Sequence, residues 1–168
     1  MTIRRLLPLL LVPALLLVEG FDVVKSSKDL PPPMQPPGER AAQDKLPQSK
    51  SPLWQRLARC DIHYDGKTGL YSVSIAPEVK AMNGSDVTIG GFVLPLDGQD
   101  NTRHFLLTKR TPVCMFCPPG APNEVIEVKA NHAVPWTDAM IKVHGRFTLV
   151  NNGEKAIFFA LNGADKLP

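Results

Sequence analysis

The segment from Asp86 to Leu96 limits the possible folds most strongly, because one predicted strand carries apolar residues on both of its faces. Side chains alternate between the two faces of a strand. One face holds Val87, Ile89 and Val93, and the other holds Phe92, Leu94 and Leu96. Gly90 and Gly91 in the middle of the segment predict a bulge or a sharp bend. Such a bend is expected where a strand crosses from one side of a small barrel to the other.

Four further segments have the pattern of strands and bring the predicted barrel to five. Ala139–Val150 alternates most clearly, and Asn151-Asn152-Gly153 after it predicts a hairpin turn. The other three are His104–Lys109, Glu124–Lys129 and Lys155–Leu161. Five strands joined mostly by hairpins predict a mainly β fold, a small OB-like antiparallel barrel with a short N-terminal helix. A β-sandwich is the alternative fold.

The composition changes at Ser51, which predicts a domain boundary. Ser51-Pro52 has the form of a helix start, a hydroxyl cap followed by proline at the first helical position. Residues 25–50 are polar and rich in proline, so they bury too little apolar surface to offset the entropy of ordering them. We therefore expect a disordered linker over 21–50 and an OB-like β domain over 51–168. A ligand for a proline-binding domain is the alternative role of the linker.

Residues 1–20 predict a signal peptide or a membrane anchor. Arg4 and Arg5 precede the apolar run Leu6–Val18, which is the layout of an export signal. The run is shorter than the roughly 20 residues that a spanning helix needs, and Val18-Glu19-Gly20 offers a cleavage site. We expect a periplasmic protein, released or anchored to the inner membrane. A cytosolic protein with a buried apolar N-terminal helix is the remaining alternative.

Charge and motifs argue against two broad classes of function. Residues 51–168 hold 12 Lys+Arg against 11 Asp+Glu, a difference of +1. Nucleic-acid binding needs clustered positive charge, so no nucleic-acid partner is expected. The chain has no G-x-S-x-G, no Gly-rich phosphate loop and no H-E-x-x-H. The sequence therefore predicts no enzymatic activity.

Cys114-x-x-Cys117 lies in the connection between two predicted strands and is the main candidate for chemistry. Two thiolates at this spacing can bind one soft metal ion such as zinc or copper. The same spacing can also form a structural disulfide in an oxidising compartment. A thiol oxidoreductase is the third alternative, but Pro118-Pro119-Gly120 prevents the helix that normally lowers the pKa of such a thiol.

Further cysteine and histidine side chains are candidates for additional ligands. Cys60-Asp61-Ile62-His63 would complete a Cys3His set with the pair, but a buried cysteine beside a solvent-facing histidine is the simpler interpretation. His104 and His132 are expected near one end of a strand hairpin, with the cysteine pair near the other. His144 falls on the outward face of its strand, which favours a plain surface role.

A series of short motifs resembles a bacterial family of exported proteins of unknown function. The motifs are the G-F-x-x-P-L segment starting at Gly91, the F-L-L segment after His104, and the proline-rich loop of Cys114 and Cys117. The resemblance implies an OB-like fold and a periplasmic location. It also implies genes beside MacB-type ABC transporters, and for some members a role in zinc or other metal handling. By position, the ligands it implies are Cys114, Cys117 and His104.

We therefore expect a periplasmic metal-binding accessory protein, associated with the components of an ABC transporter, whose cofactor is a zinc or copper ion. The alternative from another class is a metal-free partner-binding module locked by a Cys114–Cys117 disulfide.

Overall fold

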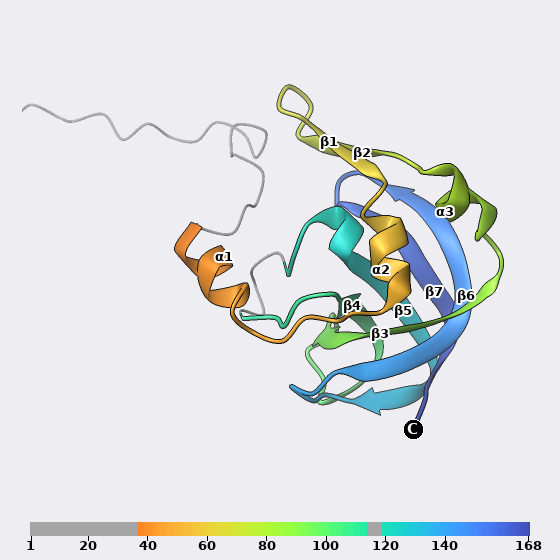
Figure 1. The fold of residues 1–168 in the computed structure, drawn as a ribbon. Coiled ribbons are helices and arrows are strands. Elements are labelled where there is room, and N and C mark those ends of the chain that lie inside the picture. Colours follow the sequence, from red (N-terminus) through yellow and green to blue (C-terminus); the bar gives the residue numbers. More distant parts are fainter. Residues whose placement is uncertain (1–36, 114–118) are drawn as a thin grey trace, which may run out of the picture.

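The computed structural model describes residues 37–113 and 119–168. A five-stranded barrel forms the centre, with short helices outside it and a two-stranded hairpin at one end (Figure 1). The helical elements are α1 (Pro37–Gln43), α2 (Pro52–Leu57), α3 (Pro77–Ala81) and the 3-10 turn η2 (Pro122–Glu124).

The barrel closes in the order β3-β4-β5-β7-β6, with β6 returning to β3. Its strands are β3 (Asp86–Pro95), β4 (Asn101–Thr108), β5 (Val125–Pro135), β6 (Ile141–Asn152) and β7 (Ile157–Lys166). The mainly β, OB-like barrel predicted from the sequence is confirmed, and the β-sandwich alternative does not hold. One detail is corrected: β5 and β7 pair in parallel, whereas the other four pairs are antiparallel. A closed ring with an odd number of strands cannot be antiparallel throughout.

Alternating side chains fill the interior of the barrel. The alternation predicted for Ala139–Val150 is confirmed in β6, since Ile141, Val143 and Phe147 are buried while Lys142, His144 and Arg146 are exposed. Phe147 stacks on Phe159 of β7 with ring centroids 6.1 Å apart. Burial of such side chains supplies roughly 2 kcal/mol each, which makes this interior the main source of stability.

The predicted bend in β3 lies where the strand changes partner. Residues 86–91 pair with β6, and residues 92–95 pair with β4. A Cβ added to Gly91 would lie 2.7 Å from the carbonyl oxygen of Thr108 and from the Leu107 side chain. Only glycine lets the two strands approach this closely, so the bend depends on the absence of a side chain at this position.

Helix α2 packs against the core of the barrel. Its buried residues are Leu53, Trp54 and Leu57. The Trp54 indole Nε1 donates a 2.8 Å hydrogen bond to the carbonyl of Gly90 in the bend of β3. The helix starts at Ser51-Pro52 as predicted, with Pro52 in its first turn, but the Ser51 hydroxyl makes no capping hydrogen bond.

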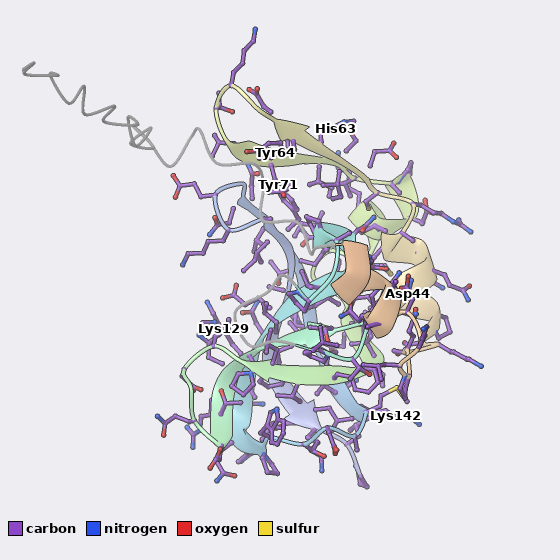
Figure 2. All side chains as sticks on the ribbon, turned by 90° about the vertical axis from the view of Figure 1, so that its left-hand side faces the viewer. Asp44, His63, Tyr64, Tyr71, Lys129 and Lys142 are labelled. Carbon is purple, nitrogen blue, oxygen red and sulfur yellow. The ribbon has the colours of Figure 1, made fainter. Side chains whose placement is uncertain are left out.

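A two-stranded hairpin, β1 (Asp61–Asp65) with β2 (Leu70–Ser74), extends beyond the barrel (Figure 1). Figure 2 shows Tyr64 and Tyr71 together on this hairpin, and their ring centroids are 4.9 Å apart. The backbone N–H of Tyr71 donates to the carbonyl of Gly153, which connects the hairpin to the β6–β7 turn.

Residues 37–50 fold against the barrel, which corrects the expected disordered linker over 21–50 for this part of the chain. Gln43 is fully buried and Ser49 is 4% exposed. The Ser49 hydroxyl donates a 2.6 Å hydrogen bond to the carbonyl of Gly90. Hydrogen bonds from polar side chains hold this segment against the barrel. Its folded state therefore could not be predicted from its content of apolar residues.

Within the described ranges, no helix has the length and apolar character needed to cross a membrane. The predicted signal peptide or anchor over residues 1–20 and the linker residues 21–36 lie outside these ranges.

Candidate functional site

The predicted cysteine pair, Cys114 and Cys117, lies outside the described residues. The structure does describe the two limbs of chain on either side of it, residues 109–113 after β4 and residues 119–124 leading through η2 into β5. We call these the outgoing limb and the returning limb. Together with α1, they define the frame of the cysteine loop.

Gln43 at the end of α1 joins the two limbs. Its amide Nε2 donates to the carbonyl of Thr111 at 2.9 Å and to the carbonyl of Pro119 at 3.2 Å. The Thr111 hydroxyl in turn donates to the carbonyl of Pro47 at 2.8 Å. A single buried amide therefore fixes the spacing at which the cysteine loop begins and ends.

Glu124 is the centre of a charged cluster beside this clamp. The guanidinium Nε of Arg110 lies 2.9 Å from its Oε2, and Nη2 of Arg40 lies 3.1 Å from the same atom. Lys109 Nζ is 3.3 Å from its Oε1, while Arg110 also pairs with Asp44. Asp44 directly follows α1 (Figure 2). Three cations and two carboxylates thus connect α1 to both limbs.

The environment of Glu124 changes its acidity strongly. Burial alone would raise the pKa of this carboxyl. The hydrogen bonds from Arg110 and from the Ala121 N–H, with the charges of Arg110 and Lys109, outweigh burial and lower the pKa to about 2. The carboxylate is therefore ionised at every physiological pH, and the cluster is a permanent ionic anchor.

Cys60 lies beside the returning limb, and among the described residues its thiol belongs to no group of metal-ligating side chains. The side-chain amide of Asn123 donates to the carbonyl of Cys60 at 3.2 Å. Cys60 is 2% exposed, and burial raises the pKa of its thiol. His63 is exposed on β1. The interpretation of a buried cysteine beside a solvent-facing histidine is confirmed.

His104 lies on β4, away from the base of the cysteine loop. Its Nε2 is 2.7 Å from Oε1 of Glu127 on β5, and both side chains are partly exposed. Four residues separate it from Thr108 at the end of β4, about 13 Å along a strand. The described part of the loop therefore does not bring His104 to the clamp formed by Gln43.

The two remaining histidines lie on the outer surface of the barrel. His132 Nδ1 is 3.0 Å from Oδ1 of Asp165, and His144 Nδ1 is 3.0 Å from the hydroxyl of Thr88. The plain surface position predicted for His144 is confirmed. Among residues 37–113 and 119–168, no three His, Cys, Asp or Glu side chains are grouped so that they could hold a metal ion.

Sequence analysis missed both groups that frame the loop. Lys109-Arg110 before the cysteines and Glu124 after them form a charge pattern that could have indicated an ionic closure. Gln43 carried no comparable signal, because it is 68 residues from Thr111 in the chain.

Fold and site define a class: a small OB-like barrel that carries a clamped C-x-x-C connection between its second and third strands. The chain belongs to the family described as protein of unknown function (DUF3299), whose model matches residues 29–158. The expectation of a family of unknown function is confirmed. A crystal structure of a DUF3299 family protein from Pseudomonas aeruginosa PAO1 is similar at 19% identity and a TM-score of 0.44, covering 58% of this chain and 68% of that one. A search of curated proteins found no match.

Proposed function

We propose that this protein binds a soft metal ion, Zn²⁺ or Cu⁺, through the thiolates of Cys114 and Cys117. The observation that carries the proposal is the bond of Gln43 to both limbs, Thr111 O on one side and Pro119 O on the other. A loop whose ends are held together before the metal arrives pays less ordering entropy on binding. Thiolate ligands select soft metals over magnesium or calcium.

The charges at the loop base also favour metal binding. A cysteine must lose its proton to coordinate a metal, and nearby cations lower the pKa of a thiol. Arg40, Lys109 and Arg110 face Asp44 and Glu124, which leaves the frame with one net positive charge. His104 is left out of the proposed ligand set, because it lies four residues before the end of β4, about 13 Å along the strand from the base of the loop.

The cellular role that we propose is that of a periplasmic accessory protein associated with an ABC transporter. Its support is the sequence resemblance, in the export-like residues 1–20 and the motifs around Gly91, His104 and the cysteine pair. In this role the protein would hold a metal ion outside the inner membrane and exchange it with the transporter.

The test combines thiol titration with metal analysis on the full chain purified from the periplasm. Two reactive thiols in the metal-stripped protein and one Zn²⁺ or Cu⁺ per chain in the loaded protein are expected. Cys114→Ser and Cys117→Ser should each weaken binding at least tenfold, because a hydroxyl stays protonated where a thiol ionises. His144→Ala is the matched control and should bind as tightly as the unchanged chain.

A second outcome would support the alternative function. Absence of metal, together with loop cysteines that react only after reduction, would indicate a metal-free partner-binding module locked by a Cys114–Cys117 disulfide. Equal metal affinities in the two serine variants and the unchanged chain would exclude a metal site at this loop.

A further inference from the structure

An apolar groove lies beside the outgoing limb, between it and the β5–β6 connection. Phe92 and Leu94 of β3 are 4% and 6% exposed, while Val113 and Trp136 are 42% and 56% exposed. The groove has a volume of about 230 Å³. Its lining residues are Phe92, Val93, Leu94, Thr111, Pro112, Val113, Trp136, Thr137 and Asp138.

The size and shape of this groove favour an extended peptide over a small molecule. Pockets for drug-sized ligands have volumes from about 300 Å³ upward, so this groove is below that range. An exposed indole beside a proline and a valine is the kind of surface on which polyproline II segments pack, since aromatic-lined grooves recognise them.

We propose that the groove binds the proline-rich segment of the same chain, residues 30–36, whose sequence is Leu-Pro-Pro-Pro-Met-Gln-Pro. A polyproline II segment loses little entropy on docking because its conformation is preformed. The proposal does not rest on the metal-binding function, because its test measures the environment of Trp136 and not the state of the cysteines.

The position of α1 makes this occupant available. The segment ends where α1 begins at Pro37, and Gln43 at the other end of α1 bonds the carbonyl of Thr111, which lines the groove. Seven helical residues span about 10 Å, whereas residues 30–36 extend over roughly 22 Å in polyproline II geometry. The segment is therefore long enough to return from Pro37 to the groove.

Tethering and charge both favour docking of residues 30–36 in the groove. A short tether gives an effective concentration on the order of millimolar, so an intrinsic dissociation constant of about 0.1 mM would leave the groove roughly nine-tenths occupied. Lys25 and Lys28 against Asp29 give residues 25–29, directly before the run, a net charge of +1. Asp138 on the groove provides an opposite charge.

The two tryptophans make the proposal measurable in the full chain. Trp54 is 1% exposed and reports on folding, while Trp136 reports on the groove. The test variant replaces Pro31, Pro32, Pro33 and Pro36 by serine. We expect its Trp136 indole N–H to shift in NMR spectra and its acrylamide quenching to rise about twofold, with the Trp54 signal unchanged. A synthetic peptide of residues 29–38 should restore the original Trp136 shift.

The matched control is Ser26→Ala with Ser27→Ala, which keeps every proline and should leave Trp136 as in the unchanged chain. Identical Trp136 signals in the unchanged chain and the proline variant would overturn the proposal. Equally tight binding of the peptide of residues 29–38 to the unchanged chain and to the proline variant would also overturn it. The groove of the unchanged chain would then be unoccupied and open to another protein. A Trp136 shift that depends on protein concentration would assign the segment to a second copy and would likewise overturn the intramolecular contact.

Discussion

Glu124 shows how one residue can connect distant parts of this chain. It is 8% exposed, yet its carboxylate has partners from α1, from the outgoing limb and from the backbone of Ala121. A buried charge is costly unless it is paired and hydrogen-bonded. Removing it would leave the Arg110 guanidinium, itself only 15% exposed, without its main partner.

The lowered pKa of Glu124 predicts an acid-sensitive fold. Its pKa is about 2 in the folded state against an ordinary 4.5, which corresponds to about 3 kcal/mol. Because the folded pKa is the lower one, this contribution is complete above about pH 5 and is lost as the pH falls toward 2. In Glu124→Gln we expect that loss at pH 7 and a flatter stability profile below pH 5. Urea unfolding at several pH values measures both effects.

Glu154→Gln, in the exposed β6–β7 turn, is the control for the acid profile. It should keep both the stability and the pH dependence of the unchanged chain. If Glu124→Gln and Glu154→Gln unfold alike across pH 2–7, the ionic anchor does not contribute to stability.

Gln43 predicts a second effect at the scale of a residue. Its replacement by alanine leaves the carbonyls of Thr111 and Pro119 without their donor, which costs roughly 1–3 kcal/mol. Hydrogen exchange should become faster in residues 109–113 and 119–124, because the limbs are no longer joined. Gln55→Ala on the exposed face of α2 makes the same substitution in a helix and should leave exchange in both limbs unchanged.

At the scale of the elements, the β6–β7 turn contains a strained residue. Ala156 has a φ of 54°, the only positive value among the described non-glycine residues. Left-handed backbone costs an L-residue about 1 kcal/mol relative to glycine. Ala156→Gly should therefore raise the free energy of unfolding by up to about 1 kcal/mol, measured by urea unfolding.

The matched control is Ala133→Gly in β5, where the backbone is extended. Glycine there gains no relief of strain and loses chain entropy, so stability should fall by about 0.5–1 kcal/mol. Destabilisation of similar size in both variants would show that the turn at Ala156 stores no strain.

The sequence predicted those elements whose hydrophobic pattern is contained within a single segment of chain. The apolar residues on both faces of β3 predicted a strand covered on both sides, and its outer side now forms the floor of the groove at Phe92 and Leu94. The parallel pairing of β5 with β7 was missed, although a ring of five strands requires one parallel pair. Strand β5 also continues to Pro135, beyond the predicted end at Lys129, because pairing with β4 and not local pattern sets its length.

The candidate site was predictable only in part for the same reason. The spacing of Cys114 and Cys117 is visible in the sequence, whereas the frame around them depends on contacts between residues 40–44 and residues 109–124. Helix α1 was hidden by its proline-rich surroundings, and its anchors are polar. Hydrophobic patterning does not detect an element held by an amide and two ion pairs.

At the scale of the whole molecule, the charge balance predicts the absence of one activity that OB-like barrels often have. Binding of single strands needs a basic groove with stacking aromatic side chains, but Phe105, Phe147, Phe158 and Phe159 are fully buried in the core. We expect no measurable binding to an oligonucleotide at physiological salt and only salt-sensitive binding at low salt. A micromolar constant in a fluorescence-anisotropy titration at physiological salt would contradict this prediction and the periplasmic location together.

The extent of the folded unit gives the last prediction. The composition predicted a domain that starts at Ser51, but the structure continues the contacts back to α1. A chain starting at Ser51 loses the three hydrogen bonds donated by the side chains of Gln43 and Ser49, at roughly 1 kcal/mol each. It also loses the ion pairs of Arg40 and Asp44, worth about 0.5 kcal/mol each.

Residues 51–168 should therefore still fold, because every strand of the barrel and α2 remain. Their free energy of unfolding should be about 4 kcal/mol below that of residues 37–168, a large part of the 5–15 kcal/mol typical of a domain. Residues 37–168 should fall below the full chain by only about 1.4 kcal/mol, because they lack residues 30–36, whose proposed tenfold excess of docked over open groove supplies that much. Urea unfolding of the three chains locates the N-terminal boundary of the domain. Equal stability of residues 51–168 and 37–168 would place this boundary at Ser51. A gap of several kcal/mol would make α1 an integral part of the domain and of the frame that holds the cysteine loop.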